Sequence, residues 1–444
     1  MSNPLAARIA EQHASTLRAL PPRLPGAARR RAAIEALAAA GLPGSRDENW
    51  KYANLRSLER QSFTPAALTR PVLAGEAAPR PAELPAALPG FPRYVFVDGV
   101  FAPALSDALD ATSARVTPLA ARAEGPEAPT KAVVPRRELG VDQRFALLNE
   151  AFATDGAAIS VPARAEPARL ELVFLASAEG QTGASYPRVE LGLDPGARLV
   201  LIERHVSAGS GASFVTSAVG AELARGAALD HYRLQQLAPR AILFDTLTAT
   251  LAQQAVYRLH AVGSGAQSAR STLRVELAGE RAELALSVAA LGDRQQVQDT
   301  YALVEHRAPH AHSEQTFRGI SAGRARVAFN GKIVVAREAH GADSRQSLRG
   351  LLAGPEAEID VRPQLEIYTD EVRCSHGATA GKLDENMFFY LLSRGLDRDT
   401  AQRALKWAFL EDVIARIEVP ELRRQVEAQL AGQMQDGATL REFM

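Results

Sequence analysis

A short phrase that recurs between residues 197 and 361 constrains the fold more than any other feature of the sequence. It consists of alanine, any residue, an apolar residue, any residue, and then an apolar or aromatic residue. The six copies lie 30, 28, 27, 43 and 32 residues apart and begin at Ala197, Ala227, Ala255, Ala282, Ala325 and Ala357. Self-similarity over a few tens of residues is typical of stacked repeats, in which each unit buries its apolar face only against its neighbours.

The copies have the alternating pattern of β-strands, and most follow a turn-like stretch that contains glycine. Repeats built only of strands predict a parallel β-solenoid. A β-sandwich also has strands at short intervals, but it does not require a repeated phrase. The solenoid interpretation predicts that the central apolar residues of the six copies stack in one interior ladder: Leu199, Leu229, Tyr257, Leu284, Val327 and Ile359.

The pattern changes along the chain predict a mainly β protein whose solenoid core is flanked by N-terminal and C-terminal α-helical domains. Apolar residues on both sides of Asp98-Gly99 predict a hairpin. After the strands, Asp384 and either Asp397 or Asp399 are placed to cap helices. We predict four regions: a helical domain and linker over 1–92, a hairpin and connecting segment over 93–165, a β-helix core over 166–376, and a helical domain over 377–444.

Composition argues against functions that depend on binding nucleic acid or membranes. Lys+Arg and Asp+Glu both total 51, and a chain of zero formal net charge has no general attraction for nucleic acid or anionic lipid. The single cysteine, Cys374, excludes an intrachain disulfide and suits a reducing compartment. No apolar run approaches the roughly 20 residues that span a bilayer. We therefore expect a cytoplasmic protein that binds neither nucleic acid nor membrane.

One segment superficially resembles a phosphate-binding loop. Gly377 to Lys382 has one intervening residue fewer than a P-loop, and Leu383 stands where Ser or Thr would bind magnesium. The sequence therefore predicts that this chain does not hydrolyse ATP and is not itself an enzyme.

Two groups of residues have metal-ligand chemistry. His306, His310 and His312 are clustered, but polar strand and loop residues are the more common explanation for such a group. Cys374 and His376 stand two residues apart, which places thiol and imidazole on one side of an extended strand. Arg373 and a charged His376 would favour the thiolate, although a lone cysteine can equally be a small buried apolar residue. An iron–sulfur cluster usually takes four thiolates as ligands. Because this chain has one cysteine, any such cluster would need further ligands from another polypeptide.

Longer motifs resemble a known family. The run from Val372 to Gly381, followed by Leu383-Asp-Glu385, Phe389-Tyr-Leu391 and Ser393-Arg-Gly395, resembles the C-terminal signature of the SufB/SufD family of scaffold subunits in the Suf iron–sulfur cluster assembly machinery. Glycine after the histidine and the single cysteine favour its SufD branch. Further similar segments are Arg46-Asp-Glu-Asn-Trp-Lys-Tyr52, Leu148-Asn-Glu-Ala-Phe-Ala-Thr-Asp-Gly156, Phe329-Asn-Gly-Lys-Ile-Val-Val335 and Leu365-Glu-Ile-Tyr368.

The resemblance implies a right-handed β-helix that pairs edge to edge with SufB, and a C-terminal helical domain that docks the ATPase SufC. It implies a role for His376, with Cys374 less firmly assigned, as ligands of a transient iron–sulfur cluster or of iron at the SufB interface. The apolar residues expected at the ATPase surface, most of them packed within the small domain itself, are Met387, Phe388, Phe389, Leu391, Trp407 and Phe409.

Two other classes of protein fit the pattern less well. A β-solenoid carbohydrate-active enzyme would use paired carboxylates, and Glu358 and Asp360 are spaced to share one face of a strand. Alternating charges on an outward face are more often simply solvated. A homodimeric scaffold without metal is the second alternative, and co-purification with an ATPase would distinguish it.

Overall fold

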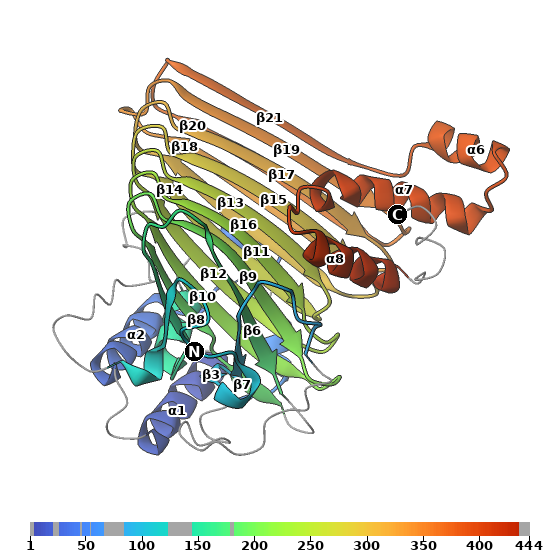
Figure 1. Ribbon diagram of the computed structural model, residues 1–444. Coiled ribbons are helices and arrows are strands. Elements are labelled where there is room, and N and C mark those ends of the chain that lie inside the picture. Colours follow the sequence, from blue (N-terminus) through green and yellow to red (C-terminus); the bar gives the residue numbers. More distant parts are fainter. Residues whose placement is uncertain are drawn as a thin grey trace.

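The repeated phrase folds as a two-sheet β-solenoid in the computed structural model (Figure 1). The structure describes residues 4–20, 26–44, 47–53, 55–65, 84–122, 144–177 and 182–434. The predicted linker over 66–92 and the linker-like stretch over 122–137 therefore lie largely outside the described residues, as do Arg46 and residues 435–444.

Strands enter the two sheets alternately along the chain. The first sheet has β4 (Arg115–Pro118), β5 (Ala157–Val161), β8 (Arg188–Leu193), β10 (Ser213–Leu223), β12 (Ile242–Leu251), β14 (Ser268–Leu277), β16 (Val297–His306), β18 (Arg326–Val335) and β20 (Glu358–Ile367), with β1 (Thr64–Pro65) and β7 (Gly183–Ser185) beside it. The second has β3 (Val100–Phe101), β2 (Arg93–Val97), β6 (Ala168–Ala176), β9 (Arg198–Ser207), β11 (Ala228–Gln236), β13 (Val256–Ser264), β15 (Glu283–Gly292), β17 (His312–Ser321), β19 (Ala342–Leu352) and β21 (Val372–Gly381).

The pairing of these strands decides between the solenoid and the sandwich. From β6 onward each long strand pairs in parallel with the strand two positions later, as β10 does with β12 and β11 with β13. A β-sandwich is built of antiparallel pairs, so that alternative is excluded. The solenoid interpretation is confirmed.

The prediction of one interior ladder is only partly correct. Leu199, Leu229, Tyr257 and Leu284 are successive partners in the second sheet. The next partner of Leu284 is Ser313, whereas Val327 and Ile359 pair with each other in the first sheet. The 43-residue interval contains a full turn of 29 residues, from 284 to 313, and a further half turn of 14, from 313 to 327. That extra half turn moves the phrase to the opposite sheet.

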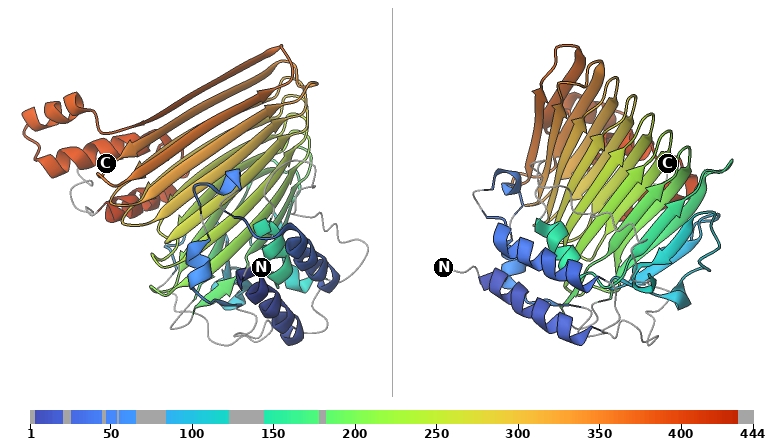
Figure 2. Two further views of the ribbon diagram at one scale, coloured as in Figure 1. Left: turned by 180° about the vertical axis from the view of Figure 1, so that it is seen from behind. Right: turned by 90° about the vertical axis from the view of Figure 1, so that its left-hand side faces the viewer.

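The N-terminal helices cover the outer face of the first sheet (Figure 2). Two 3₁₀ segments, Pro103–Leu105 and Leu119–Ala121, lie outside this group. The covering helices are α1 (Pro4–Ala19), α2 (Ala27–Ala40), α3 (Arg56–Arg60) and α5 (Arg144–Phe152), with the 3₁₀ segment Glu48–Trp50. Trp50 is buried between them, with its ring centroid 5.1 Å from Phe145 and 5.6 Å from Phe244 of the sheet. The predicted hairpin is confirmed, because Val97 pairs antiparallel with Val100.

The C-terminal helices divide into a packed pair and a projecting helix (Figures 1 and 2). α7 (Arg398–Ile414) and α8 (Pro420–Gln433) lie on the outer face of the second sheet, where Trp407 and Leu410 join one apolar cluster with Ile202 and Tyr232. α6 (Glu385–Ser393) projects away from this body. Asp384 caps α6 and Asp397 caps α7. None of the described helices is long and apolar enough to cross a membrane.

Gly331 provides a stability test of the solenoid interior. A Cβ there would lie 2.8 Å from Gln346 Nε2 and 2.9 Å from Phe329 Cε1, inside a packed core. We expect Gly331→Ala to lower the free energy of unfolding by about 1–3 kcal/mol, as measured by urea denaturation. Gly192→Ala is the matched control, because a Cβ at that strand position meets nothing within 4 Å. Equal stability of the two variants would contradict this packing.

Candidate functional site

The candidate site lies at the end of the solenoid formed by β20 and β21, where the stack of turns stops (Figure 1). Each of these strands is the last of its sheet, so each has a pairing neighbour on only one side within the described chain. None of their residues is buried, whereas β16 and β17 of the preceding turns are almost wholly buried. Within the described residues, the last turn therefore leaves two strand edges and its interior-facing side chains uncovered.

Cys374 and His376 both lie on β21 at this open end. Cys374 is half-buried and packs against the interior core cluster, and its partner on the preceding strand is Ser344. His376 is exposed and pairs with Gln346. Because alternate residues of a strand share a face, the thiol and the imidazole stand on the same, inward side. The strand runs to Gly381, five residues past the end of the core expected at 376.

A set of buried polar residues, the polar column, lies beneath these two side chains. Ser344 Oγ is 2.8 Å from Ser313 Oγ, and Ser313 Oγ is 2.9 Å from His306 Nε2. Gln346 Nε2 donates to Gln315 Oε1 at 3.2 Å and to the carbonyl oxygen of residue 331 at 3.1 Å. In the two turns before the column, the same ladder positions hold Leu284 and Leu286 on β15, and Tyr257 and Leu259 on β13. At these two ladder positions the interior is apolar in β13 and β15 and polar from β17 to the open end.

The environment of Cys374 does not favour the thiolate. Burial is the largest effect and raises the pKa of the thiol, and the Asp343 carboxylate raises it further. A hydrogen bond from the Ser344 backbone opposes this shift. The expectation that Arg373 would stabilise the thiolate is wrong for this chain, because Arg373 alternates to the opposite, exposed side of the strand.

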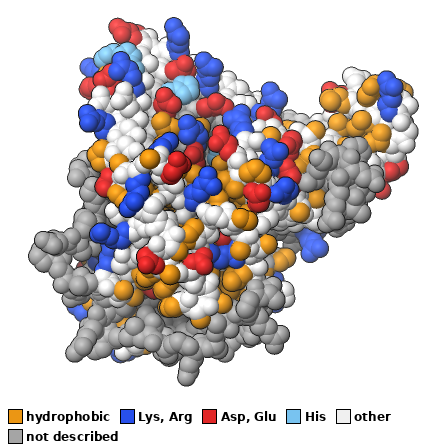
Figure 3. Space-filling view, in the orientation of Figure 1, with side chains coloured by type: hydrophobic (Ala, Val, Ile, Leu, Met, Phe, Trp, Pro, Cys, Tyr) orange, Lys and Arg blue, Asp and Glu red, His pale blue; other side chains and the backbone are white. Residues whose placement is uncertain are grey.

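The second candidate surface is α6. It contains no buried residue, and Met387, Phe389 and Tyr390 are 57%, 72% and 54% exposed. In Figure 3 hydrophobic side chains gather on the projecting lobe that α6 forms. Phe388 and Leu391 are partly covered, and the ring of Phe388 lies 5.2 Å from the guanidinium carbon of Arg398.

The prediction for the six apolar residues of this region needs correction. Most were expected to pack within the small helical domain, yet Met387 and Phe389 are exposed. Trp407 is 7% exposed and is buried against the solenoid, and Phe409 packs on the same cluster. Trp407 is thus part of the core beneath α7 and not of a free docking surface. Sequence reasoning also missed Tyr390.

Comparison with known proteins agrees with this geometry. The sequence profile described as "SUF system FeS cluster assembly, SufBD core domain" matches residues 174–409, more than half of the chain. The iron-sulfur cluster assembly protein SufD of Escherichia coli (strain K12) is 31% identical over 409 residues, which cover 91% of this chain and 92% of that protein. The chain belongs to the SufB/SufD family.

Other relatives have the same family description or a plastid location in their names. An iron-sulfur cluster assembly SufBD family protein of Synechocystis is 28% identical over 407 residues, covering 89% of this chain and 88% of its own length. The chloroplastic protein ABCI7 of Arabidopsis thaliana is 27% identical over 270 residues, covering 59% and 57%.

One of the SufB/SufD family motifs outside β21, the segment Leu148–Gly156, has a structural role. Asn149 is buried and donates two hydrogen bonds from Nδ2, to the carbonyl oxygens of Pro187 at 2.8 Å and Thr216 at 2.7 Å. The neighbouring Glu150 pairs with Arg188 at 2.9 Å. These contacts fasten α5 to the first sheet, so the motif positions the helices on the solenoid.

The three histidines that cluster in the sequence have three different environments. His306 lies in the polar column, His310 is on a turn with its ring against His340, and His312 is 3.9 Å from Asp343. Within the described residues, no group of three or more His, Cys, Asp or Glu side chains is arranged to hold a metal ion. At the open end, Cys374 and His376 offer two donors of the four that an iron–sulfur cluster usually takes.

The remaining motifs are explained by the strands. Gly377–Gly381 is extended strand within β21, so it does not form the loop before a helix that cradles phosphate. Glu358 and Asp360 both face Arg326, Glu358 in a close ion pair and Asp360 at 3.9 Å. Their arrangement is that of a solvated, charge-paired strand face.

Proposed function

We propose that this chain is a non-catalytic scaffold subunit of cytoplasmic iron–sulfur cluster assembly, which pairs with SufB at the open end of its solenoid and docks the ATPase SufC through α6. Two observations support this proposal: the chain belongs to the SufB/SufD family, and the edges of β20 and β21 are uncovered at the end of the solenoid where Cys374 and His376 lie. The same family resemblance supports a right-handed hand for the solenoid.

The uncovered last turn supports pairing with another strand-rich chain. Exposed strand edges present unpaired backbone groups that a second chain can continue as a sheet. Six large hydrophobic residues are exposed in the described chain. Two of them, Ile367 and Tyr368, lie at the end of β20 and support pairing at this edge. Three lie on α6 and support docking of a partner there. Only Leu109 lies elsewhere.

The two donors at the open end support a shared cluster site. His376 is exposed and can meet ligands from outside the chain, whereas Cys374 is half-buried with a raised pKa. The cluster is the cargo of assembly, so a transient site shared with cysteines of SufB fits this donor set better than a resident site in this chain. His376 is then the principal ligand candidate, and Cys374 the secondary one.

A second copy of this chain could cover the same edges when SufB is absent. The isolated protein would then be a homodimer, and SufB would compete with the second copy for β20 and β21.

Co-expression tests the proposed function. We expect this chain, SufB and SufC to elute together from a tag on this chain, and the purified complex to bind iron and sulfide when supplied with both. Colorimetric iron and sulfide assays give the stoichiometry, and the tagged chain expressed alone is the control. Elution of this chain without SufB, or equal cluster content in SufB–SufC preparations that lack it, would contradict the proposal.

A further inference from the structure

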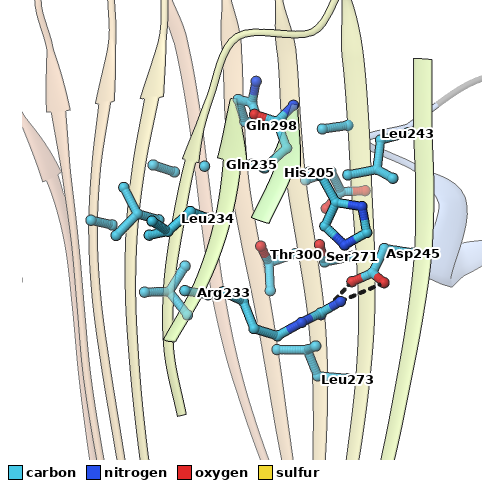
Figure 4. Close-up of a pocket in the computed structure, with 18 of the residues that line it drawn as sticks. His205, Arg233, Leu234, Gln235, Leu243, Asp245, Ser271, Leu273, Gln298 and Thr300 are labelled. Carbon is cyan, nitrogen blue, oxygen red and sulfur yellow. Dashed lines mark hydrogen bonds and ion pairs between the residues drawn. The ribbon is translucent and has the colours of Figure 1, made fainter. Parts of the chain in front are cut away.

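A second polar feature lies deep inside the solenoid, away from the open end. A cavity of about 60 Å³, here called the inner chamber, lies between the two sheets in the turns from β9 to β16 (Figure 4). This volume is enough for a ligand of a few non-hydrogen atoms. Its wall is mainly apolar, from residues such as Leu243, Leu259 and Leu273. One polar side is formed by His205, Arg233, Gln235 and Asp245, and Ser271, Gln298 and Thr300 add further polar groups from the first sheet.

The polar side of the inner chamber is held rigidly by buried ion pairs. The Arg233 guanidinium donates to both oxygens of Asp245, at 2.6 and 3.0 Å, and to Glu203 Oε1 at 2.7 Å. Glu203 also contacts His205 Nε2 at 2.7 Å and His231 Nε2 at 3.1 Å. Burial, the largest effect, lowers the pKa of His231, which keeps that ring neutral.

Three atoms on this side have no hydrogen-bond partner among the described residues: His205 Nδ1, Arg233 Nε and Gln235 Nε2. These three residues are 3%, 7% and 8% exposed. Gln235 Oε1 accepts from the Ser264 backbone at 3.1 Å, which fixes the amide with its nitrogen free. Figure 4 shows the three side chains around the same space. Buried polar groups normally have partners, so their convergence on one cavity indicates a ligand.

The chemistry of these atoms selects the class of ligand. Arg233 Nε and Gln235 Nε2 donate. His205 Nε2 lies 2.7 Å from a carboxylate oxygen of Glu203 and so carries the hydrogen of that contact, and in this tautomer Nδ1 is an acceptor. The carboxylates of Glu203 and Asp245 outnumber the single guanidinium of Arg233. This excess of negative charge beside the chamber disfavours binding of an anion. Two free donors disfavour a cation. A small neutral molecule that both donates and accepts hydrogen bonds satisfies all three atoms.

We propose that the inner chamber binds hydrogen sulfide, as the neutral molecule, between Arg233, Gln235 and His205. The choice between sulfide and water rests on the proposed function, because iron–sulfur clusters are built from sulfide. The largely apolar wall also favours the less strongly hydrated of the two molecules. The chamber would then hold sulfide inside the scaffold, several turns away from the open end.

Crystals of the full-length chain, soaked at mildly acidic pH in sodium sulfide, test this binding. Long-wavelength data are expected to show an anomalous sulfur peak within hydrogen-bond distance of Arg233 Nε and Gln235 Nε2. Density in the chamber without an anomalous signal would identify water and overturn the proposal. A parallel soak in sodium bromide tests for anions, and a bromide peak in the chamber would overturn the neutral-ligand assignment.

Two variants make the test specific. Gln235→Glu keeps the acceptor for Ser264 but removes the free donor, and should weaken sulfide binding roughly tenfold or more. Gln296→Glu is the matched control, because Gln296 Oε1 likewise accepts from a backbone N–H, that of Asp293 at 2.9 Å, and Gln296 does not line the chamber. The sulfide peak in this variant should be unchanged. If Gln235→Glu does not fold, Ala261→Leu is the alternative variant, because the larger side chain fills the chamber and should abolish the sulfide peak. A peak that survives in the folded chamber variant would refute the site.

This readout is separate from cluster assembly. Sulfide binding is measured on the chain alone, without iron, SufB or SufC. A chamber that fails to bind sulfide would leave the proposed function standing. Conversely, loss of co-purification with SufB would leave a sulfide peak in the chamber intact.

Discussion

Replacing His376 with alanine should reduce the iron and sulfide content of the assembled complex by about tenfold or more, the scale of loss typical when a metal site loses a supporting group. His376 is exposed on the inward side of β21, where ligands from a partner can meet it. The substitution removes no buried contact, so the melting temperature should stay within about 2 °C of the wild type. Iron and sulfide assays and a thermal melt on the same preparation measure both quantities.

His312→Ala is the matched control, because His312 is a partly exposed strand histidine on β17, two strands before β21 in the same sheet. It should leave cluster content unchanged. Cys374→Ser should cause a smaller loss than His376→Ala, because the thiol is half-buried, its pKa is raised, and thiolates from SufB can supply the cluster. A normal cluster content in His376→Ala, with a lowered melting temperature, would show that His376 has only a structural role.

The sequence predicts the solenoid because the apolar residues of the strands recur at nearly regular intervals. These intervals do not determine which residues pair in every turn. The 43-residue interval hides a half turn, and only the strand pairs show that Leu284 is followed by Ser313 and not by Val327. With the correct register, Ser313, Ser344 and Cys374 become one ladder at intervals of 31 and 30 residues. That regular spacing is the signal by which the polar column could have been found.

The candidate site is predictable in identity but not in environment. The C-x-H spacing correctly places Cys374 and His376 on one side of a strand. It does not show which charged neighbours share that side: Asp343 raises the pKa of the thiol, whereas Arg373 lies on the opposite side of the strand. For α6, the apolar pattern identifies residues that would be buried against the chain itself or against another protein. It cannot distinguish a helix packed on its own domain from one that projects. Capping by Asp384 is compatible with both.

The arrangement of α7 and α8 limits how the proposed docking of an ATPase on α6 can be tested. Removing residues 384–444 would delete α6, but it would also uncover Ile202, Tyr232 and Leu351 on the outer face of the second sheet, where Trp407 and Leu410 pack. The truncated solenoid would then expose a large apolar surface, and a loss of binding would be ambiguous. Point substitutions on α6 avoid this difficulty, because none of its residues is buried.

Phe389→Asp should weaken binding of the SufC ATPase by roughly thirtyfold or more, since an aromatic residue at the centre of an interface commonly contributes about 2 kcal/mol. Phe389 is 72% exposed and lies between the exposed Met387 and Tyr390, so the change should not affect folding. Leu109→Asp is the control, because Leu109 is 40% exposed and lies far along the chain from α6. Calorimetric titration of SufC into each variant gives the dissociation constants. Wild-type affinity in Phe389→Asp, or an equal loss in Leu109→Asp, would place the docking surface elsewhere.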